Sequence, residues 1–271
     1  VDRVSSRTPL DLGVYPLSTC QFRPLGKSIY LAAPWQEVFV PGEKYVPTIM
    51  STTAMVVGLS KAKEDVKQLP RNLVNKAQDY VIRKLKGIFV KTPDQMISSY
   101  DECLNNLSLD KSPGYPYFTD CETKFDALVK YGDLIKGKTF ELLEGKYVES
   151  IFALTEKSEL RPQSKVEANK TRVFMSGPMH HLLASMVLFM KQNEDLIDQR
   201  HYIPSTIGIQ LPGPEFVGRL INLGDELNDG DVSGCDLRFH PTIARVIRDV
   251  RKHSLPPKYH AAVDLLYDTV Y

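Results

Sequence analysis

The sequence predicts an α+β fold, in which several helices are combined with a few scattered strands. Three observations lead to this prediction. The first sixty residues are rich in Pro, Val and Tyr and contain short extended runs without a helical period. From Leu69 onward, apolar residues recur at the i, i+3/i+4 spacing of amphipathic helices. Strands and helices do not alternate regularly, as they would around a parallel α/β sheet.

Length and composition are those of an ordinary globular protein. The chain has 271 residues, which at roughly 100–200 residues per domain allows one large domain or two modest ones. Apolar residues make up 42% and charged residues 25%, which argues against a disordered tail. The net charge is +1, so the chain as a whole has no bulk affinity for nucleic acid or membrane. An anionic ligand must therefore be bound by a local cluster.

Cysteine spacing and hydropathy favour an intracellular protein or a piece of one. Four cysteines lie far apart, with no C-x-x-C pair and no zinc-type spacing to histidine: Cys20, Cys103, Cys121 and Cys235. This pattern argues against a disulfide scaffold or structural zinc. The longest apolar run, residues 182–190, is shorter than the about 20 residues that cross a bilayer. Residues 1–4 show neither an initiator Met nor a signal pattern, so we expect the chain to begin inside a longer translation unit.

The predicted elements follow from these local patterns. Strands are expected over residues 28–33 and 37–40, which Pro34 and Pro41 end. A first helix ends before Gly87, at the C′ position, and its recurring apolar residues are Leu73, Ala77, Tyr80, Val81 and Leu85. A second helix is opened by Pro93-Asp94 and carries Met96, Ile97, Tyr100, Cys103 and Leu104. A third covers residues 124–135.

Three further helices are expected after a loop-like basic stretch. Pro178 begins the first, whose apolar side is formed by Leu182, Leu183, Met186, Val187 and Met190. The other two run over residues 242–252 and 257–271. We expect the apolar residues of all three to form core rather than a cofactor site. The six histidines, including the adjacent His180 and His181, have no metal-type spacing, so surface or core roles are expected for them.

A pair of carboxylates near the C-terminus is a candidate site. Asp231 and Asp236 are five residues apart, so they cannot share one face of a single strand. They can meet at one site if a strand carrying Asp231 turns at residues 233–234 and Asp236 opens the next element. One aspartate could then bind a divalent metal while the other contacts a ligand hydroxyl. A surface turn is the alternative, because Asp, Ser and Gly favour turns.

Residues 157–172 form a local basic cluster. Five cations, Lys157, Arg161, Lys165, Lys170 and Arg172, stand against two anions, Glu159 and Glu167, which leaves a local charge of +3. The segment lacks an apolar helical period and contains Pro162, so we expect the cations on a loop or short hairpin. Guanidinium groups bind phosphates in bidentate fashion and lysines add point charge, so a polyphosphate ligand suits the cluster. A solvated charged loop is the alternative.

A stiff turn is predicted at residues 111–117. Its prolines restrict φ, its glycine allows close backbone approach, and its two tyrosines could stack on bases. The residues that could contact a nucleic acid here are Ser112, Pro113, Gly114, Tyr115 and Pro116. A purely structural turn is the alternative for this segment taken alone.

The three segments, taken in order, resemble the RNA-dependent RNA polymerases of positive-strand RNA viruses in the picornavirus-like supergroup. Residues 112–117 (S-P-G-Y-P-Y) resemble motif G of that family, usually S-x-G-Y-P-Y. Residues 157–172 resemble motif F, K-D-E-L-R, K-V-E and K-T-R in succession. Residues 231–241 resemble motif A, D-x4-D with a proline ten residues after the first aspartate. The resemblance spans about residues 110–245, and the first hundred residues carry no motif of the family.

The resemblance implies a right-hand polymerase fold made of the fingers and the first part of the palm. Residues 1–177 would be fingers with an N-terminal fingertip segment, and 178–271 a partial palm containing a palm helix and motif A. Asp231 would bind catalytic Mg²⁺ or Mn²⁺, and Asp236 the ribose 2′-hydroxyl. The triphosphate would be held by Lys157, Arg161, Lys165 and Arg172, with Lys170 supporting them or the template. The turn at 112–117 would guide the template.

This chain departs from the family pattern in several places. Ser158 stands where motif F has Asp, and Cys235 stands where motif A has an aromatic residue. Residues 227–230 before Asp231 are not an apolar strand. The Gly-Asp-Asp motif is absent, and the Gly-Asp pairs at 132–133 and 224–225 lack apolar strand flanks. We therefore expect the N-terminal part of a polymerase, inactive when alone.

Two other functions stay open at this stage. One is a non-catalytic RNA-binding module that holds RNA by charge and stacking. The other is a reverse transcriptase or related palm polymerase, against which the turn at 112–117 and the K-T-R ending argue. Expected partners of a polymerase are template and primer RNA, nucleoside triphosphates, the rest of the enzyme and other replication proteins, at membrane-associated complexes in host cytoplasm. Residues 165–172 look potyvirus-like, whereas 172–179 look closer to insect picorna-like viruses, and astroviruses stay possible sources.

Overall fold

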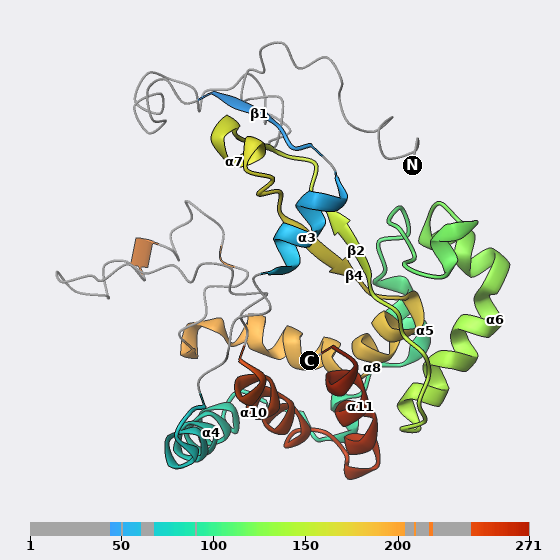
Figure 1. Ribbon diagram of the computed structural model, residues 1–271. Coiled ribbons are helices and arrows are strands. Elements are labelled where there is room, and N and C mark those ends of the chain that lie inside the picture. The colour runs from blue at the N-terminus through green and yellow to red at the C-terminus, as the bar shows by residue number, and fades with distance from the viewer. Residues whose placement is uncertain are drawn as a thin grey trace. The chain divides into compact units, whose positions relative to one another are not determined.

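The computed structural model describes residues 44–49, 51–60, 68–89, 91–203, 209, 217–218 and 240–270 (Figure 1). The chain consists of two compact units. The first is formed by Val1–Glu64 and Leu154–Ser176, and the second by Asp65–Ala153 and Gly177–Tyr271. The predicted strands at 28–33 and 37–40 and the carboxylates Asp231 and Asp236 lie outside the described residues. The predicted fingers–palm boundary after residue 177 stays a prediction.

In the described residues, the first unit contains four short strands and two helices. The helices are α3 (Thr52–Ser60) and α7 (Gln163–Glu167), and the strands are β1 (Tyr45–Pro47), β2 (Ala153–Glu156), β3 (Leu160–Pro162) and β4 (Val173–Ser176). β1 pairs antiparallel with β3 in the register Tyr45↔Pro162, Val46↔Arg161 and Pro47↔Leu160. β2 pairs with β4 in a second two-stranded sheet. Each strand of the first sheet therefore comes from a distant part of the chain.

Helix α3 corrects the expectation that the first sixty residues contain no helix. Ser51 precedes it, and the Ser51 hydroxyl accepts a hydrogen bond from the Ala54 N–H at 3.1 Å. This is an N-cap, which satisfies one of the donors that the first helical turn leaves open. Ala54 is fully buried, whereas Val56 is exposed, and α3 contacts β4. The β-branched residues of α3 favour a strand and gave no helical period, but Ser51 could have indicated the start of a helix.

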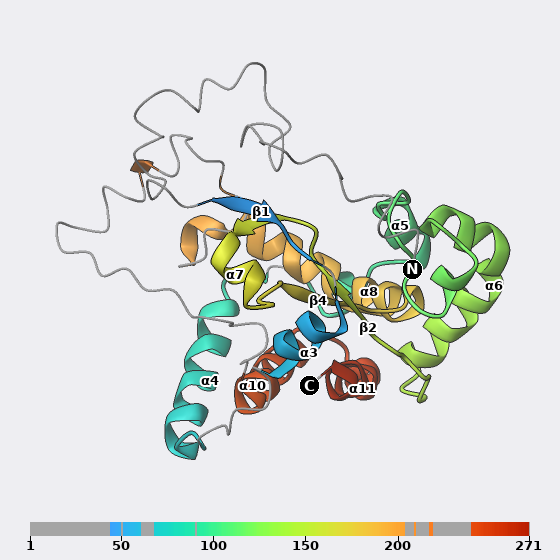
Figure 2. The ribbon, with the colours of Figure 1, turned by 45° about the horizontal axis from the view of Figure 1, so that its top comes forward.

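The second unit is mainly helical. The α-helices described in it are α4 (Arg71–Leu85), α5 (Tyr100–Asn105), α6 (Lys124–Leu143), α8 (Met179–Asp198), α10 (Pro241–Lys252) and α11 (His260–Val270). Its 3₁₀ turns are η4 (Asp94–Met96), η5 (Tyr117–Thr119), η6 (Arg200–Tyr202) and η7 (Pro257–Tyr259). Helix α8 is the centre of this unit, since α5, α6 and α11 all contact it (Figure 2). None of the helices in the described ranges has the length and apolar character that a bilayer crossing requires.

Burial along α8 confirms the helix predicted from Pro178. Met179, Leu183, Val187 and Leu188 lie in the core of the second unit. Burying each such side chain contributes about 1.5–3 kcal/mol, so this stripe is a main stabilising feature of the unit. The predicted helices near 242–252 and 257–271 are confirmed as α10 and as η7 followed by α11.

Two predicted helices differ from the observed ones. The helix expected through Met96 and Leu104 is broken, because Ser99 has extended backbone angles and caps a separate helix. The Ser99 hydroxyl accepts from Glu102 N–H and the Glu102 carboxylate accepts from Ser99 N–H, a capping box that fixes the new start. The helix expected over 124–135 continues to Leu143 and is kinked at Tyr131.

Helix α4 confirms its predicted position but not its predicted face. Gly87 follows the C-cap Lys86, as expected, but does not adopt a positive φ. Leu73 and Tyr80 are exposed by 57% and 55%, although both belong to the predicted apolar face. The half-buried positions are Val74, Gln78, Ile82 and Leu85, of which Leu85 alone belongs to the predicted face. Helix α4 contacts α10.

Candidate functional site

The basic segment 157–172 links the two strands of the β2–β4 sheet. It is not a plain loop, because it contains β3 and the short helix α7, which carries Lys165. This corrects the expectation that all its cations lie on a loop or hairpin. Pro162 stands at the N-cap of α7, so the proline that argued against a helix here in fact begins one.

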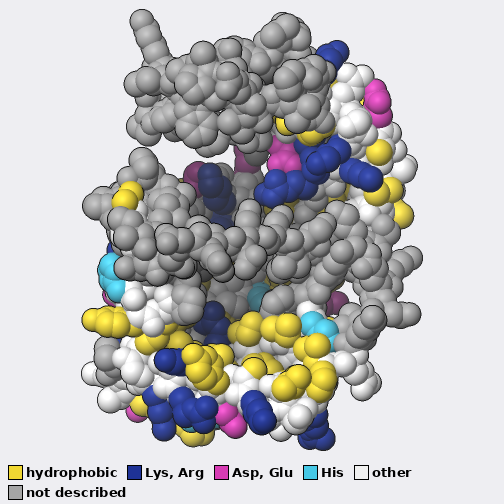
Figure 3. Space-filling model, turned by 90° about the vertical axis from the view of Figure 1, so that its left-hand side faces the viewer, with side chains coloured by type: hydrophobic (Ala, Val, Ile, Leu, Met, Phe, Trp, Pro, Cys, Tyr) yellow, Lys and Arg dark blue, Asp and Glu magenta, His cyan; other side chains and the backbone are white. Residues whose placement is uncertain are grey.

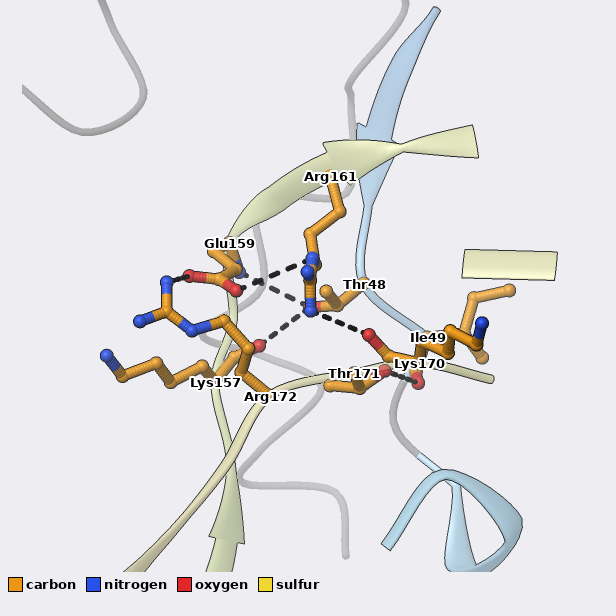
Figure 4. A network of polar contacts seen from close by, with 8 residues as sticks. All are labelled: Thr48, Ile49, Lys157, Glu159, Arg161, Lys170, Thr171 and Arg172. Carbon is orange, nitrogen blue, oxygen red and sulfur yellow. Dashed lines mark hydrogen bonds and ion pairs between the residues drawn. The ribbon is translucent and has the colours of Figure 1, made fainter. Parts of the chain in front are cut away.

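The five cations divide into an exposed group and one inward residue. Four are exposed to solvent: Lys157, Lys165, Lys170 and Arg172. Arg161 is only 20% exposed in its side chain. Its Nη1 donates a hydrogen bond to the Lys170 carbonyl at 2.7 Å, and its Nε lies 3.9 Å from a Glu159 carboxylate oxygen (Figure 4). Arg161 therefore ties one end of the segment to the other.

Glu159 lies between two of the guanidinium groups. Its side chain is 12% exposed, and Arg172 Nη1 lies 3.3 Å from its Oε2. A partly buried carboxylate with two neighbouring cations restrains both of them more than an exposed pair would. Glu159 thus orients the exposed Arg172 while neutralising part of the local charge. Figure 3 shows Lys and Arg side chains of the first unit gathered on one face beside acidic ones.

The N-terminal segment 44–51 holds the basic segment from the other side. The Thr48 hydroxyl donates to the Lys157 carbonyl at 2.8 Å and accepts from the Glu159 N–H at 3.3 Å (Figure 4). Thr48 N–H donates to the Glu159 carbonyl at 3.0 Å. The Thr171 hydroxyl donates to the Ile49 carbonyl at 3.3 Å. Thr48 is a site residue that sequence reasoning missed, and its sequence separation of 109 residues from Lys157 left no local signal.

The turn at 111–117 lies in the second unit and has a buried and an exposed side. Pro113, Gly114 and Tyr117 are buried, whereas Tyr115 is 37% exposed and Ser112 and Pro116 are also exposed. Gly114 has φ of +76°, and a Cβ at this position would lie 2.2 Å from the Gly177 carbonyl oxygen. Only glycine fits there, because both the backbone angle and the contact exclude a side chain.

Tyr117, the last residue of the turn, belongs to a buried polar network. Its hydroxyl lies 2.8 Å from His180 Nδ1 on α8, and His180 is fully buried. Burial, with the charge of Lys138 as a smaller cause, lowers the pKa of His180 to about 4. Burial also raises the pKa of Tyr117 to about 12. Both groups are therefore neutral near pH 7.

The predicted metal site cannot be built from the described residues, because Asp231 and Asp236 lie outside them. Within the described ranges, no group of three or more His, Cys, Asp or Glu side chains could hold a metal ion. The described part resumes at His240, which caps α10 through a hydrogen bond from Thr242 N–H to His240 Nδ1 at 3.0 Å. Pro241 of the motif A-like segment is the first residue of that helix, where proline is favoured.

Comparisons with known proteins agree with the resemblance drawn from the motifs. The family described as "Viral RNA-dependent RNA polymerase" matches residues 39–271. Genome polyprotein 1 of Barley yellow mosaic virus (strain Japanese II-1) is 28% identical over 259 residues, covering 87% of this chain and 10% of the polyprotein. The replicase polyprotein of Drosophila C virus (strain EB) is 28% identical over 225 residues, covering 70% of this chain and 13% of the polyprotein. The chain thus spans about a tenth of the curated relatives it matches.

A solved structure shows the same fold. The Sicinivirus 3Dpol RNA dependent RNA polymerase superposes with a TM-score of 0.64 at 19% identity, covering 87% of this chain and 53% of that chain. The mixed helices and strands described above therefore form part of a right-hand polymerase fold, as predicted. Since the family description covers all but the first 38 residues, the chain belongs to the viral RNA-dependent RNA polymerase family.

Proposed function

We propose that the protein containing this chain copies an RNA template into RNA by nucleotidyl transfer from nucleoside triphosphates. The observation that carries the proposal is the exposed cation group Lys157, Lys165, Lys170 and Arg172, borne on a segment that Thr48 and Arg161 hold by hydrogen bonds. The segment 157–172 has a local charge of +3 in a chain whose net charge is +1. Such a preorganised array suits a ligand with several negative charges, as a triphosphate has.

In the proposed reaction, these cations bind the triphosphate and offset the charge that develops on the pyrophosphate leaving group. Arg172 can present its planar fork to two phosphate oxygens, because Glu159 restrains it from one edge. Arg161 acts differently within the proposal. Its guanidinium already donates to the Lys170 carbonyl. We therefore propose that Arg161 supports the segment that carries the exposed cations and contributes positive charge without contacting the triphosphate directly.

We assign the divalent metal, Mg²⁺ or Mn²⁺, to Asp231 and the ribose 2′-hydroxyl contact to Asp236, on the strength of the family motif. When bound, the metal would lower the charge repulsion between the attacking hydroxyl and the triphosphate. The exposed side of the turn, formed by Ser112, Tyr115 and Pro116, would contact template RNA. The other proposed partners are primer RNA, the rest of the polymerase and further replication proteins. We also propose that the protein works at membrane-associated complexes in host cytoplasm. Fractionation of infected cells would test this location.

Replacing Arg172 with alanine should raise the KM for nucleoside triphosphate about tenfold in the complete polymerase, with a smaller change in kcat. The reason is that Arg172 is an exposed cation, and among the described residues its ion pair is with Glu159 through Nη1, which leaves the rest of its fork available. Steady-state incorporation at varied nucleotide concentration measures both constants. Arg172→Lys keeps the positive charge, so its KM for nucleoside triphosphate should lie between those of wild type and Arg172→Ala.

The matched control is Lys76→Ala, which removes an exposed cation from α4 in the other unit and should leave the KM unchanged. An unchanged KM in Arg172→Ala would remove the nucleotide-binding assignment. An equal rise in both variants would mean that bulk charge, rather than the basic segment, attracts the nucleotide.

Purified residues 1–271 alone should not extend an RNA primer. The sequence contains the D-x4-D carboxylates but no Gly-Asp-Asp, so it supplies one side of the proposed metal site. Template-dependent incorporation of a labelled nucleotide is the measurement, with the complete polymerase as positive control. Incorporation by residues 1–271 would refute this expectation, whereas RNA binding without synthesis by the complete polymerase would favour the RNA-binding module.

A further inference from the structure

The turn at 112–117 has an exposed side and a buried side. The position of the exposed side depends on the residues against which the buried side packs. Pro113 and Gly114 are buried, and Gly114 faces the Gly177 carbonyl oxygen just before α8. Tyr117 is 2% exposed and contacts His180 in the first turn of α8. The start of α8 is therefore the surface that supports the turn. Sequence reasoning gave His180 no role beyond surface or core.

The hydrogen-bond partners of His180 determine which ring nitrogen carries the proton. Its Nε2 lies 3.3 Å from the Glu149 carbonyl oxygen, which can only accept, and 3.2 Å from the Ser150 hydroxyl. The proton must then be on Nε2, and Nδ1 is left as an acceptor. The Tyr117 hydroxyl consequently donates to Nδ1 at 2.8 Å. The lowered pKa of His180 and the raised pKa of Tyr117 agree with this neutral arrangement.

The ring geometry adds a second restraint. The Tyr117 and His180 rings meet edge to face, with centroids 5.8 Å apart and planes at 81°. The centroid of the Tyr117 ring also lies 5.9 Å from that of the Tyr131 ring, at the kink of α6. The orientation of Tyr117 is thus defined by one directional hydrogen bond and two packed rings. Tyr115 lies only two residues before it, so a rotation of Tyr117 would be transmitted to the exposed side of the turn.

We propose that His180 is a positioning residue for the template: by accepting a hydrogen bond from the Tyr117 hydroxyl, it holds the turn so that Tyr115 faces the RNA. The inference rests on the proposed function of the turn as a template contact. It assigns His180 a role beyond filling the core, because an aliphatic side chain could fill the same space but could not orient a hydroxyl. Removing one partner also leaves the other buried and unsatisfied, so the pair acts as a unit.

The test is a double-mutant cycle in the complete polymerase, read out as the Kd for a fluorescently labelled template RNA. Tyr117→Phe and His180→Leu should each weaken template binding about fivefold, and the double variant should be no weaker than either single one. His180→Asn offers an oxygen near the Nδ1 position and should restore binding to within about twofold of wild type. The KM for nucleoside triphosphate should stay unchanged in all of them.

A merely structural His180 would give a different result. All variants would then lose thermal stability while the folded protein kept its template Kd, and His180→Asn would give no rescue. Either finding would overturn the inference. Tyr117→Phe removes a single oxygen atom, so the test stands even if His180→Leu fails to fold. Tyr147→Phe, on a tyrosine that is 76% exposed, is the matched control and should leave template binding unchanged.

Tyr115→Ala separates failure of the inference from failure of the proposed function. If Tyr115→Ala weakens template binding but Tyr117→Phe and His180→Leu do not, the turn contacts RNA and only the role of His180 is wrong. If none of the three weakens template binding, the turn is not a template contact, and both assignments are wrong.

Discussion

Asparagine in place of Asp231 should lower nucleotide incorporation by the complete polymerase about 10³-fold or more, while the protein stays folded. The substitution keeps the size and hydrogen-bonding shape of the side chain and removes its negative charge. A divalent cation that must be held against the triphosphate depends on that charge, since carboxylates are the preferred ligands of Mg²⁺. Incorporation of labelled nucleotide on a primed template measures the loss.

The control for this experiment is Asp133→Asn. Asp133 is exposed on α6 and follows a glycine, but it lies in a helix and lacks the apolar strand flanks of the Gly-Asp-Asp motif. It should leave activity unchanged. Template binding by Asp231→Asn should also be retained, because the turn and the basic segment are untouched. Activity above about a tenth of wild type in Asp231→Asn would contradict the polymerase mechanism proposed for this chain.

Alanine at Gly114 should destabilise the second unit by about 3 kcal/mol. The positive φ of +76° already disfavours a side chain, and the added Cβ would overlap the Gly177 carbonyl oxygen, 2.2 Å away. Relief requires the turn to move away from the start of α8, which would also displace Tyr115 and weaken template binding. The midpoint of chemical denaturation gives the stability change.

Gly137→Ala is the matched control on the same unit. Gly137 lies inside α6, and a Cβ there would meet nothing within 4 Å. Alanine is the better helix former, so this variant should be stabilised by about 0.5–1 kcal/mol. Equal stability of Gly114→Ala and wild type would show that the turn is not seated on Gly177 as described.

The predictable parts of the fold are those decided within one or two helical turns. Pro178 and the apolar stripe that follows it predicted α8, because a helix start and an i, i+3/i+4 period are both local. The break between η4 and α5 shows the limit of periodicity. There the apolar spacing continues through Ile97, but the capping box of Ser99 and Glu102 starts a new helix.

At the candidate site, the residue types were enough to identify the cations. They did not show which cations are exposed and which face inward. All five positive residues of 157–172 look equivalent along the chain, yet Arg161 turns inward to the Lys170 carbonyl while Arg172 stays 60% exposed. The difference arises because β1 pairs with β3 and fixes the backbone at Arg161. No pattern within the segment could reveal a strand partner more than a hundred residues away.

What the amino-acid order determined by itself was the α+β class, most helices of the second unit and the three motif-like segments, since each depends on neighbouring residues. Only the tertiary structure decided that Thr48 fastens Lys157 and Glu159, that Arg161 faces inward, and that His180 supports Tyr117. These contacts join residues separated by many tens of positions, except for Arg161 and Lys170, which are nine positions apart. They form because folding buries polar groups that must then find partners, and those partners are set by the packing of distant segments.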